Sequence, residues 1–99
     1  MTTPEPRDTA IKRLKMRSMR RGIKEMDLIL SDFAGRALDG MEPAELLLYD
    51  QLLEENDHDI YGWVNGQFAV PEHYAEMIAR IADGARGIVR PGVFGGAIE

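Results

Sequence analysis

The sequence contains no cysteine and few residues that favour β-strands. Without cysteine the chain can form no disulfide, no thiolate nucleophile and no cysteine-ligated metal site, and it suits a reducing compartment. Valine and threonine occur only four and three times in 99 residues, and no segment alternates apolar and polar side chains as a half-buried strand does. Helix-forming residues dominate, so the composition predicts an all-α protein.

Long apolar runs are also missing. No segment approaches the roughly 20 apolar residues with which a helix crosses a membrane. The first eight residues are polar and include Glu5 and Asp8, so we expect neither a secretory signal nor a transit peptide. These features predict a soluble, cytoplasmic protein. With 99 residues, 44% of them hydrophobic, the chain can bury one core and form one domain.

Side chains that commonly act in catalysis are scarce. The two histidines, His58 and His73, fall in different predicted elements, and the two serines, Ser18 and Ser31, lie in no nucleophile-elbow pattern. No glycine-rich phosphate loop follows a strand, and no metal-ligand spacing stands out. The sequence therefore predicts that the chain is not an enzyme.

Charge is divided unevenly along the chain. Residues 1–24 carry eight of the twelve basic residues and two acids, whereas residues 25–99 carry four basic residues and fifteen acids. This separation indicates that the N-terminal segment meets something anionic. We interpret four of the acids as a solvated acidic face: Glu54, Glu55, Asp57 and Asp59.

Apolar spacing and turn residues predict two helices in the first 40 residues. The first begins at Asp8 or Thr9 and continues to about Arg21. We expect Gly22 to end it in the left-handed conformation, which glycine adopts without steric cost. The second covers residues 23–38 and carries an apolar stripe of Ile23, Met26, Leu30, Phe33 and Ala37.

Three shorter helices follow. Pro43 suits the first position of a helix that continues to about residue 53. Residues 56–59 form a break and a new N-cap before a short helix of residues 60–64. Pro71 opens the last helix, whose apolar stripe is Tyr74, Met77, Ile78, Ile81 and Ala85. We predict a compact bundle of about five short helices, with a flexible leader at 1–7, a helical domain at 8–86 and a flexible, glycine-rich tail at 87–99.

The corner between the first two helices is the most informative segment. It reads Arg-Arg-Gly-Ile-Lys-Glu-Met-Asp over residues 20–27. Cations at the end of one helix and acids at the start of the next favour the helix dipoles, so a well-capped corner accounts for the pattern. The first helix has more cations than capping requires, which also allows a binding surface.

Arg21-Gly22-x-x-Glu25, followed by Met26-Asp27, resembles the RGxxE signature of the SdhE family of flavinylation factors. The similarity spans roughly residues 11–82 and includes the segment from Leu52 to Val64, which matches the acidic and tryptophan pattern of the family. The resemblance implies a partner-binding surface with the following residues: Arg13, Arg17, Arg20, Arg21, Gly22, Glu25 and Asp27.

The family resemblance also implies the function and the partner. It implies a protein that binds the flavoprotein subunit of succinate dehydrogenase, and also that of fumarate reductase, and promotes covalent attachment of FAD. FAD is then the cofactor of the client, and we expect no cofactor to be stably bound here. We expect a monomer when free, without membrane insertion and without nucleic acid. The alternative is a small nucleic-acid-binding protein that uses the basic first helix, although the acidic remainder would repel a duplex.

Overall fold

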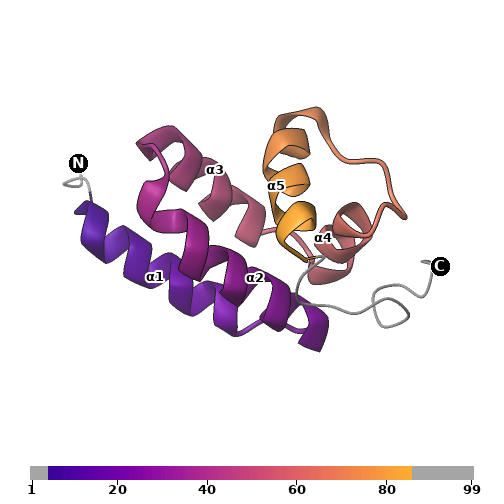
Figure 1. Ribbon diagram of the computed structural model, residues 1–99, viewed down its shortest axis with the longest axis horizontal. Helices are drawn as coiled ribbons and strands as arrows, with labels where there is room; N and C mark the ends of the chain where they lie inside the picture. The colour runs from indigo at the N-terminus through magenta and orange to yellow at the C-terminus, as the bar shows by residue number, and fades with distance from the viewer. Residues whose placement is uncertain (1–4, 86–99) are drawn as a thin grey trace.

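The computed structural model describes residues 5–85, which form five α-helices and two short 3-10 helices (Figure 1). No strand occurs in this part of the chain, which confirms the all-α prediction. None of the helices within it is long and apolar enough to cross a membrane. The elements are α1 (Arg7–Met19), α2 (Lys24–Ala37), η1 (Leu38–Gly40), α3 (Pro43–Leu53), α4 (Asp57–Val64), η2 (Glu72–Tyr74) and α5 (Ala75–Ala85).

Helix α2 is the central element of the bundle. It forms a hairpin with α1, and it also contacts α4 and α5, which pack against each other (Figure 1). Helix α3 packs beside α1. The core lies between these elements, where the rings of Phe33 and Tyr49 approach to 5.7 Å between centroids.

The apolar stripes predicted from the sequence face this core. In α2, Met26, Leu30 and Phe33 are buried, whereas Ile23 and Ala37 at its two ends are only partly buried. In α5 the buried residues follow the expected spacing of three and four: Met77, Ile78, Ile81 and Ala85. The periodicity therefore identified the buried faces of both helices correctly.

One polar contact lies inside the core between α1 and α3. Ser18 and Tyr49 are fully buried, and their hydroxyl oxygens lie 2.6 Å apart. Ser18 donates its single proton to the carbonyl of Leu14 at 2.7 Å. The Tyr49 hydroxyl must then be the donor to Ser18, because a serine hydroxyl carries only one proton. Burial raises the pKa of Tyr49 to about 12.

Helix starts follow the predicted signals in two places. Pro43 is the first residue of α3, and Glu42 and Glu45 form a capping box around it. Asn56 caps α4, where its side chain accepts a hydrogen bond from the backbone N–H of His58. In contrast, Pro71 precedes the 3-10 turn η2, and α5 begins only at residue 75.

The first helix departs from its expected limits. It begins at Arg7, so the predicted boundary at residue 8 is one residue late, and it ends at Met19 rather than near Arg21. Residues 1–4 and 86–99 lie outside the described residues, so the flexible leader and the flexible tail stay predictions.

The expected conformation of Gly22 is wrong. The only glycine with a positive φ within residues 5–85 is Gly66, and Gly22 does not adopt the left-handed region. Helix α1 ends instead because its chain leaves the helical conformation at Arg20, with φ −124° and ψ 61°. The glycine at position 22 is instead explained by a side chain that lies close to it.

Candidate protein-interaction site

The corner between α1 and α2 is held by two carboxylates from different elements. Asp27, in the first turn of α2, accepts a hydrogen bond from the backbone N–H of Arg21. Asp57, the first residue of α4, accepts one from the backbone N–H of Gly22 at 2.5 Å. The two exposed donors of the corner are therefore satisfied by side chains, as the ends of helices require.

The guanidinium group of Arg21 also holds the corner in place. It forms an ion pair with Asp57 at 2.7 Å, and its Nε donates to the same carboxylate at 2.8 Å. It also donates to the carbonyl oxygen of Leu53 at 3.0 Å. The side chain of Arg21 is only 9% exposed and that of Asp57 17%. Arg21 thus ties the corner to the junction of α3 and α4.

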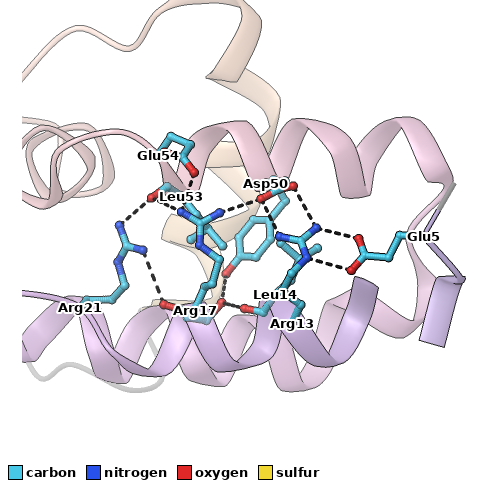
Figure 2. A network of polar contacts seen from close by, with 10 residues as sticks. Glu5, Arg13, Leu14, Arg17, Arg21, Asp50, Leu53 and Glu54 are labelled. Atoms are coloured by element: carbon cyan, nitrogen blue, oxygen red, sulfur yellow. Dashed lines mark hydrogen bonds and ion pairs between the residues drawn. The ribbon is translucent and has the colours of Figure 1, made fainter. Parts of the chain in front are cut away.

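Two further arginines on the same face of α1 reach α3 (Figure 2). Arg13 binds Asp50 at 3.0 Å and Glu5 at 2.9 Å, and Arg17 binds Asp50 at 2.7 Å and Glu54 at 2.9 Å. Because these arginines are four residues apart, they lie in one row on the helix. We call the row the arginine ladder; it consists of Arg13, Arg17 and Arg21 with Glu5, Asp50, Glu54 and Asp57.

The ladder changes the titration of its carboxylates. Hydrogen bonds from Arg13, reinforced by the charges of Arg13 and Arg17, hold the pKa of Asp50 below its ordinary value. The hydrogen bond from Arg13 likewise lowers the pKa of Glu5. Asp50 and Glu5 thus stay ionised at neutral pH.

A second set of residues around the corner remains available to a partner. The side chains of Arg20, Lys24 and Glu25 form no hydrogen bond or ion pair within residues 5–85, and the two cations are exposed. Met16 and Arg20 border one hollow, and Met19 and Leu28 border another. Spacings of three and four residues along α1 and α2 join these positions into one area. We call it the corner surface: Met16, Met19, Arg20, Lys24, Glu25 and Leu28.

Half of the residues of the corner surface are large apolar side chains that are exposed. The side chains of Met16, Met19 and Leu28 are 51%, 56% and 48% exposed. Their exposure agrees with the sequence-based expectation for the two methionines, whereas Met26 belongs to the core. Apolar side chains gathered on an exposed face, with charges at the edge, are typical of a protein-interaction surface.

The seven residues predicted to bind a partner therefore divide into two groups. The structure brings Arg20, Gly22 and Glu25 to the exposed side of the corner, with Glu25 half-buried. It engages the other four in contacts within the chain: Arg13, Arg17, Arg21 and Asp27. No contact with a partner tests either group, so their binding role stays a prediction.

The pairing of the acidic residues of the ladder was not predicted from the sequence. Asp57 was interpreted as part of a solvated face, which is wrong because Asp57 is mostly buried against Arg21. Glu54 is exposed but paired with Arg17. A signal was present: Asp50, Glu54 and Asp57 follow one another at intervals of four and three, which matches the spacing of the arginines on α1.

Metal-binding and aromatic residues add little to this site. Within the described residues no group of three or more histidine, aspartate or glutamate side chains could hold a metal ion. Trp63 is partly buried and lies 5.6 Å from the ring of Tyr74, so it packs at the edge of the core as the sequence indicated.

Comparison with known proteins gives a consistent answer. A family model described as flavinator of succinate dehydrogenase matches residues 12–85. The mitochondrial succinate dehydrogenase assembly factor 2 of Schizosaccharomyces pombe is 46% identical over 70 residues, which cover 71% of this chain and 50% of that protein. The assembly factor of the same name from Meyerozyma guilliermondii is 47% identical over 68 residues, covering 69% of this chain and 50% of that protein.

An animal relative shows the same pattern. The mitochondrial succinate dehydrogenase assembly factor 2-B of Drosophila ananassae is 39% identical over 79 residues, which cover 78% of this chain and 48% of that protein. The chain thus spans about half the length of the curated relatives it matches. Their names also correct the prediction of a cytoplasmic protein, because they point to the mitochondrion.

Proposed function

This chain belongs to the family described as flavinator of succinate dehydrogenase, as its RGxxE segment predicted, and on that premise we propose that it is an assembly factor for this enzyme. It binds the flavoprotein subunit and promotes covalent attachment of FAD to a histidine of that subunit. The relatives named as assembly factors support this proposal, and so does the corner surface. The flavoprotein subunit of fumarate reductase is a second client of the same kind.

The observation that carries the proposal is the exposed corner itself. Arg20, Lys24 and Glu25 present charges that no side chain of the described residues neutralises, and apolar side chains lie beside them. A partner that covers these groups gains both apolar contact and ion pairs. Such a surface suits protein binding better than chemistry on a small molecule.

The factor acts by positioning its client. The bond between histidine and flavin forms within the client, which holds the FAD, and this chain stably binds no cofactor of its own. A bound factor holds the client's domains in the arrangement in which the histidine and the flavin meet. Positioning of this kind raises the rate of a reaction without a catalytic side chain from the factor. The chain is therefore not an enzyme in this proposal, and it is monomeric when free.

The arginine ladder weakens the alternative of nucleic-acid binding. Two cations of α1, Arg13 and Arg17, and Arg21 just beyond its end are neutralised by carboxylates of the same chain. Lys15 lies 3.7 Å from Asp39. A phosphate backbone would have to compete with these acids for each contact, which reduces the electrostatic gain on binding.

Glu25→Ala tests the proposal, with Glu76→Ala as a matched control. Both glutamates lie in the first turn of a helix, Glu25 in α2 and Glu76 in α5, so each variant should lose a similar dipole interaction of about 0.3–1 kcal/mol. Only Glu25 belongs to the corner surface. We expect both variants to keep their helix content, and only Glu25→Ala to reduce covalent flavin on the flavoprotein subunit.

The measurement is in-gel flavin fluorescence of that subunit in cells whose only source of the factor is the variant. A loss of about 2 kcal/mol in binding would be ordinary for a central contact residue. Normal flavinylation with a folded Glu25→Ala variant contradicts the proposed site. An unfolded Glu25→Ala variant contradicts it differently, because Glu25 would then be structural.

A further inference from the structure

We propose that Asp57 is a positioning residue for the partner-binding corner, and that Arg21 acts through Asp57 rather than by touching the partner. This inference rests on the proposed function and deepens it. The two charged residues of the RGxxE segment then have different roles. Arg21 holds the corner in shape through contacts within the chain, and Glu25 contacts the partner.

The carboxylate of Asp57 receives several contacts from the corner. Asp57 accepts from the backbone N–H of Gly22 at 2.5 Å and from Nε of Arg21 at 2.8 Å, and it also pairs with the second nitrogen of that guanidinium group. The corner residues between α1 and α2 belong to no helix, so their own helices do not fix them. Asp57, together with Asp27, therefore holds the backbone between Arg20 and Lys24 in place.

Arg21 has little left to offer a partner. Its side chain is 9% exposed, and the nitrogen that pairs with Asp57 also donates to the carbonyl oxygen of Leu53 at 3.0 Å. The remaining nitrogen donates to the carbonyl oxygen of Arg17 at 3.5 Å. Arg21 also lines the hollow that Met16 and Arg20 border, but a partner carboxylate could take the two nitrogens that bind Asp57 only by displacing Asp57. Removing one partner from a buried ion pair is strongly unfavourable, since it leaves an uncompensated charge.

The same carboxylate explains the glycine of the segment. A Cβ atom built on Gly22 would lie 3.1 Å from Oδ2 of Asp57, a distance at which the carboxylate must shift. The backbone at this position is not left-handed, so the missing side chain matters because it leaves room for Asp57. Arg21, Gly22 and Asp57 thus form one unit, in which the glycine lets the carboxylate reach the backbone.

Asp57→Asn is the central variant, and Asp59→Asn is its matched control. The asparagine has nearly the same size, but Gly22 and Arg21 bind different oxygens of Asp57, and the asparagine has an acceptor oxygen at only one of these two positions. Asp59 lies two residues further along α4, is exposed and has no contact with the corner. The partner in the assay is the purified flavoprotein subunit of succinate dehydrogenase without covalent flavin, supplied with FAD.

For Asp57→Asn we expect the dissociation constant for this subunit to rise about tenfold, the size of a 1.4 kcal/mol loss. The rate of flavinylation should fall with it at limiting factor. Asp59→Asn should match the unchanged chain. Exchange of the Gly22 amide hydrogen should accelerate only in Asp57→Asn, and helix content at the assay temperature should be equal in all three proteins.

Two more variants keep the test decisive if Asp57→Asn is unstable. Gly22→Ala leaves every charge in place and displaces only the carboxylate, so it should weaken binding in the same direction. Asp57→Glu keeps the charge and both acceptor oxygens, so it should recover part of the affinity that Asp57→Asn loses. A purely structural role would change the stability of these variants without this order of affinities in the folded proteins.

The opposite results are equally distinct. If Arg21 touches the partner directly, Asp57→Asn releases its guanidinium, and binding should stay unchanged or become tighter. That result overturns the inference while the proposed function stands. If the unchanged chain neither binds the subunit nor promotes flavinylation, the proposed function fails, and the inference fails with it.

Discussion

Helix α1 has two charged sides that behave in opposite ways. On one side the arginines of the ladder form ion pairs of 2.7–3.0 Å with carboxylates of the same chain, and Figure 2 shows those of Arg13 and Arg17. On the other side, Arg20 and the neighbouring Lys24 have no acid to meet within residues 5–85. Arg20 is thus exposed, whereas the side chain of the adjacent Arg21 is only 9% exposed.

The comparison separates two causes of a basic helix. The charge division along the chain indicated that the N-terminal segment meets something anionic, and for Arg13, Lys15, Arg17 and Arg21 that counterpart is the acidic part of the same chain. Only the cations left over are candidates for recognition. A count of basic residues overstates a binding surface wherever such internal pairing occurs.

The largest expected effect on stability comes from replacing Arg21 with alanine, and the same replacement at the adjacent Arg20 gives the comparison. Arg21→Ala should lower the free energy of unfolding by about 3 kcal/mol, because it leaves Asp57 buried without its partner. Arg20→Ala should change it by less than about 0.5 kcal/mol, as surface substitutions do. Urea denaturation followed by circular dichroism measures both. Equal losses in the two variants would remove the distinction between ladder and corner surface.

The buried hydroxyl pair beneath the ladder should give a smaller effect. Ser18→Ala leaves the Tyr49 hydroxyl without an acceptor in the core, which costs about 1–3 kcal/mol. Tyr49→Phe removes the donor and should cost about 1 kcal/mol. The double variant should be less destabilised than the sum of the two, because it removes both polar groups together. Strict additivity in denaturation would show that the two hydroxyl groups do not interact.

The difference between the two sides of α1 also marks what sequence could predict. Helix identity and the buried stripes of α2 and α5 were predictable, because their spacing repeats within a few residues. Pro43 and Asn56 were readable as helix starts for the same local reason. The corner residues around Gly22 were found as a candidate site through the family resemblance.

The ladder was not predicted because its pairs join residues far apart in the sequence. Arg21 and Asp57 are 36 residues apart, and Ser18 and Tyr49 are 31 apart. Which acids face α1 depends on how α3 packs beside it, and that packing is set by the whole core. The conformation of Gly22 was misjudged for the same reason, since a carboxylate of α4 explains the glycine and the local chain does not.

Acid should weaken the arginine ladder through Asp50. The pKa of Asp50 is lowered in the folded protein by Arg13 and Arg17, so its contribution to stability is present above its unfolded pKa and lost as the pH falls through the lower, folded value. Asp50→Asn should lower the stability at pH 7 by about 1 kcal/mol or less, the usual range for exposed pairs. It should also flatten the decline of stability below about pH 4. A decline as steep as in the unchanged chain would show that Asp50 has no part in it.

The smallest effect on stability, and the clearest one on binding, is expected from the exposed methionines. Met16 and Met19 are 51% and 56% exposed, so replacing both with glutamine removes few core contacts and should change the unfolding free energy by less than about 0.5 kcal/mol. Leu47→Gln is the control, because Leu47 is 62% exposed and lies on α3, away from the corner. In a binding assay with the flavoprotein subunit, the double methionine variant should weaken affinity severalfold, while Leu47→Gln should not, because only the methionines border the hollows beside Arg20 and Leu28. Equal weakening by Leu47→Gln would extend the docking area to α3. No weakening by either variant would mean that the charges of the corner, and not its apolar side chains, carry the contact.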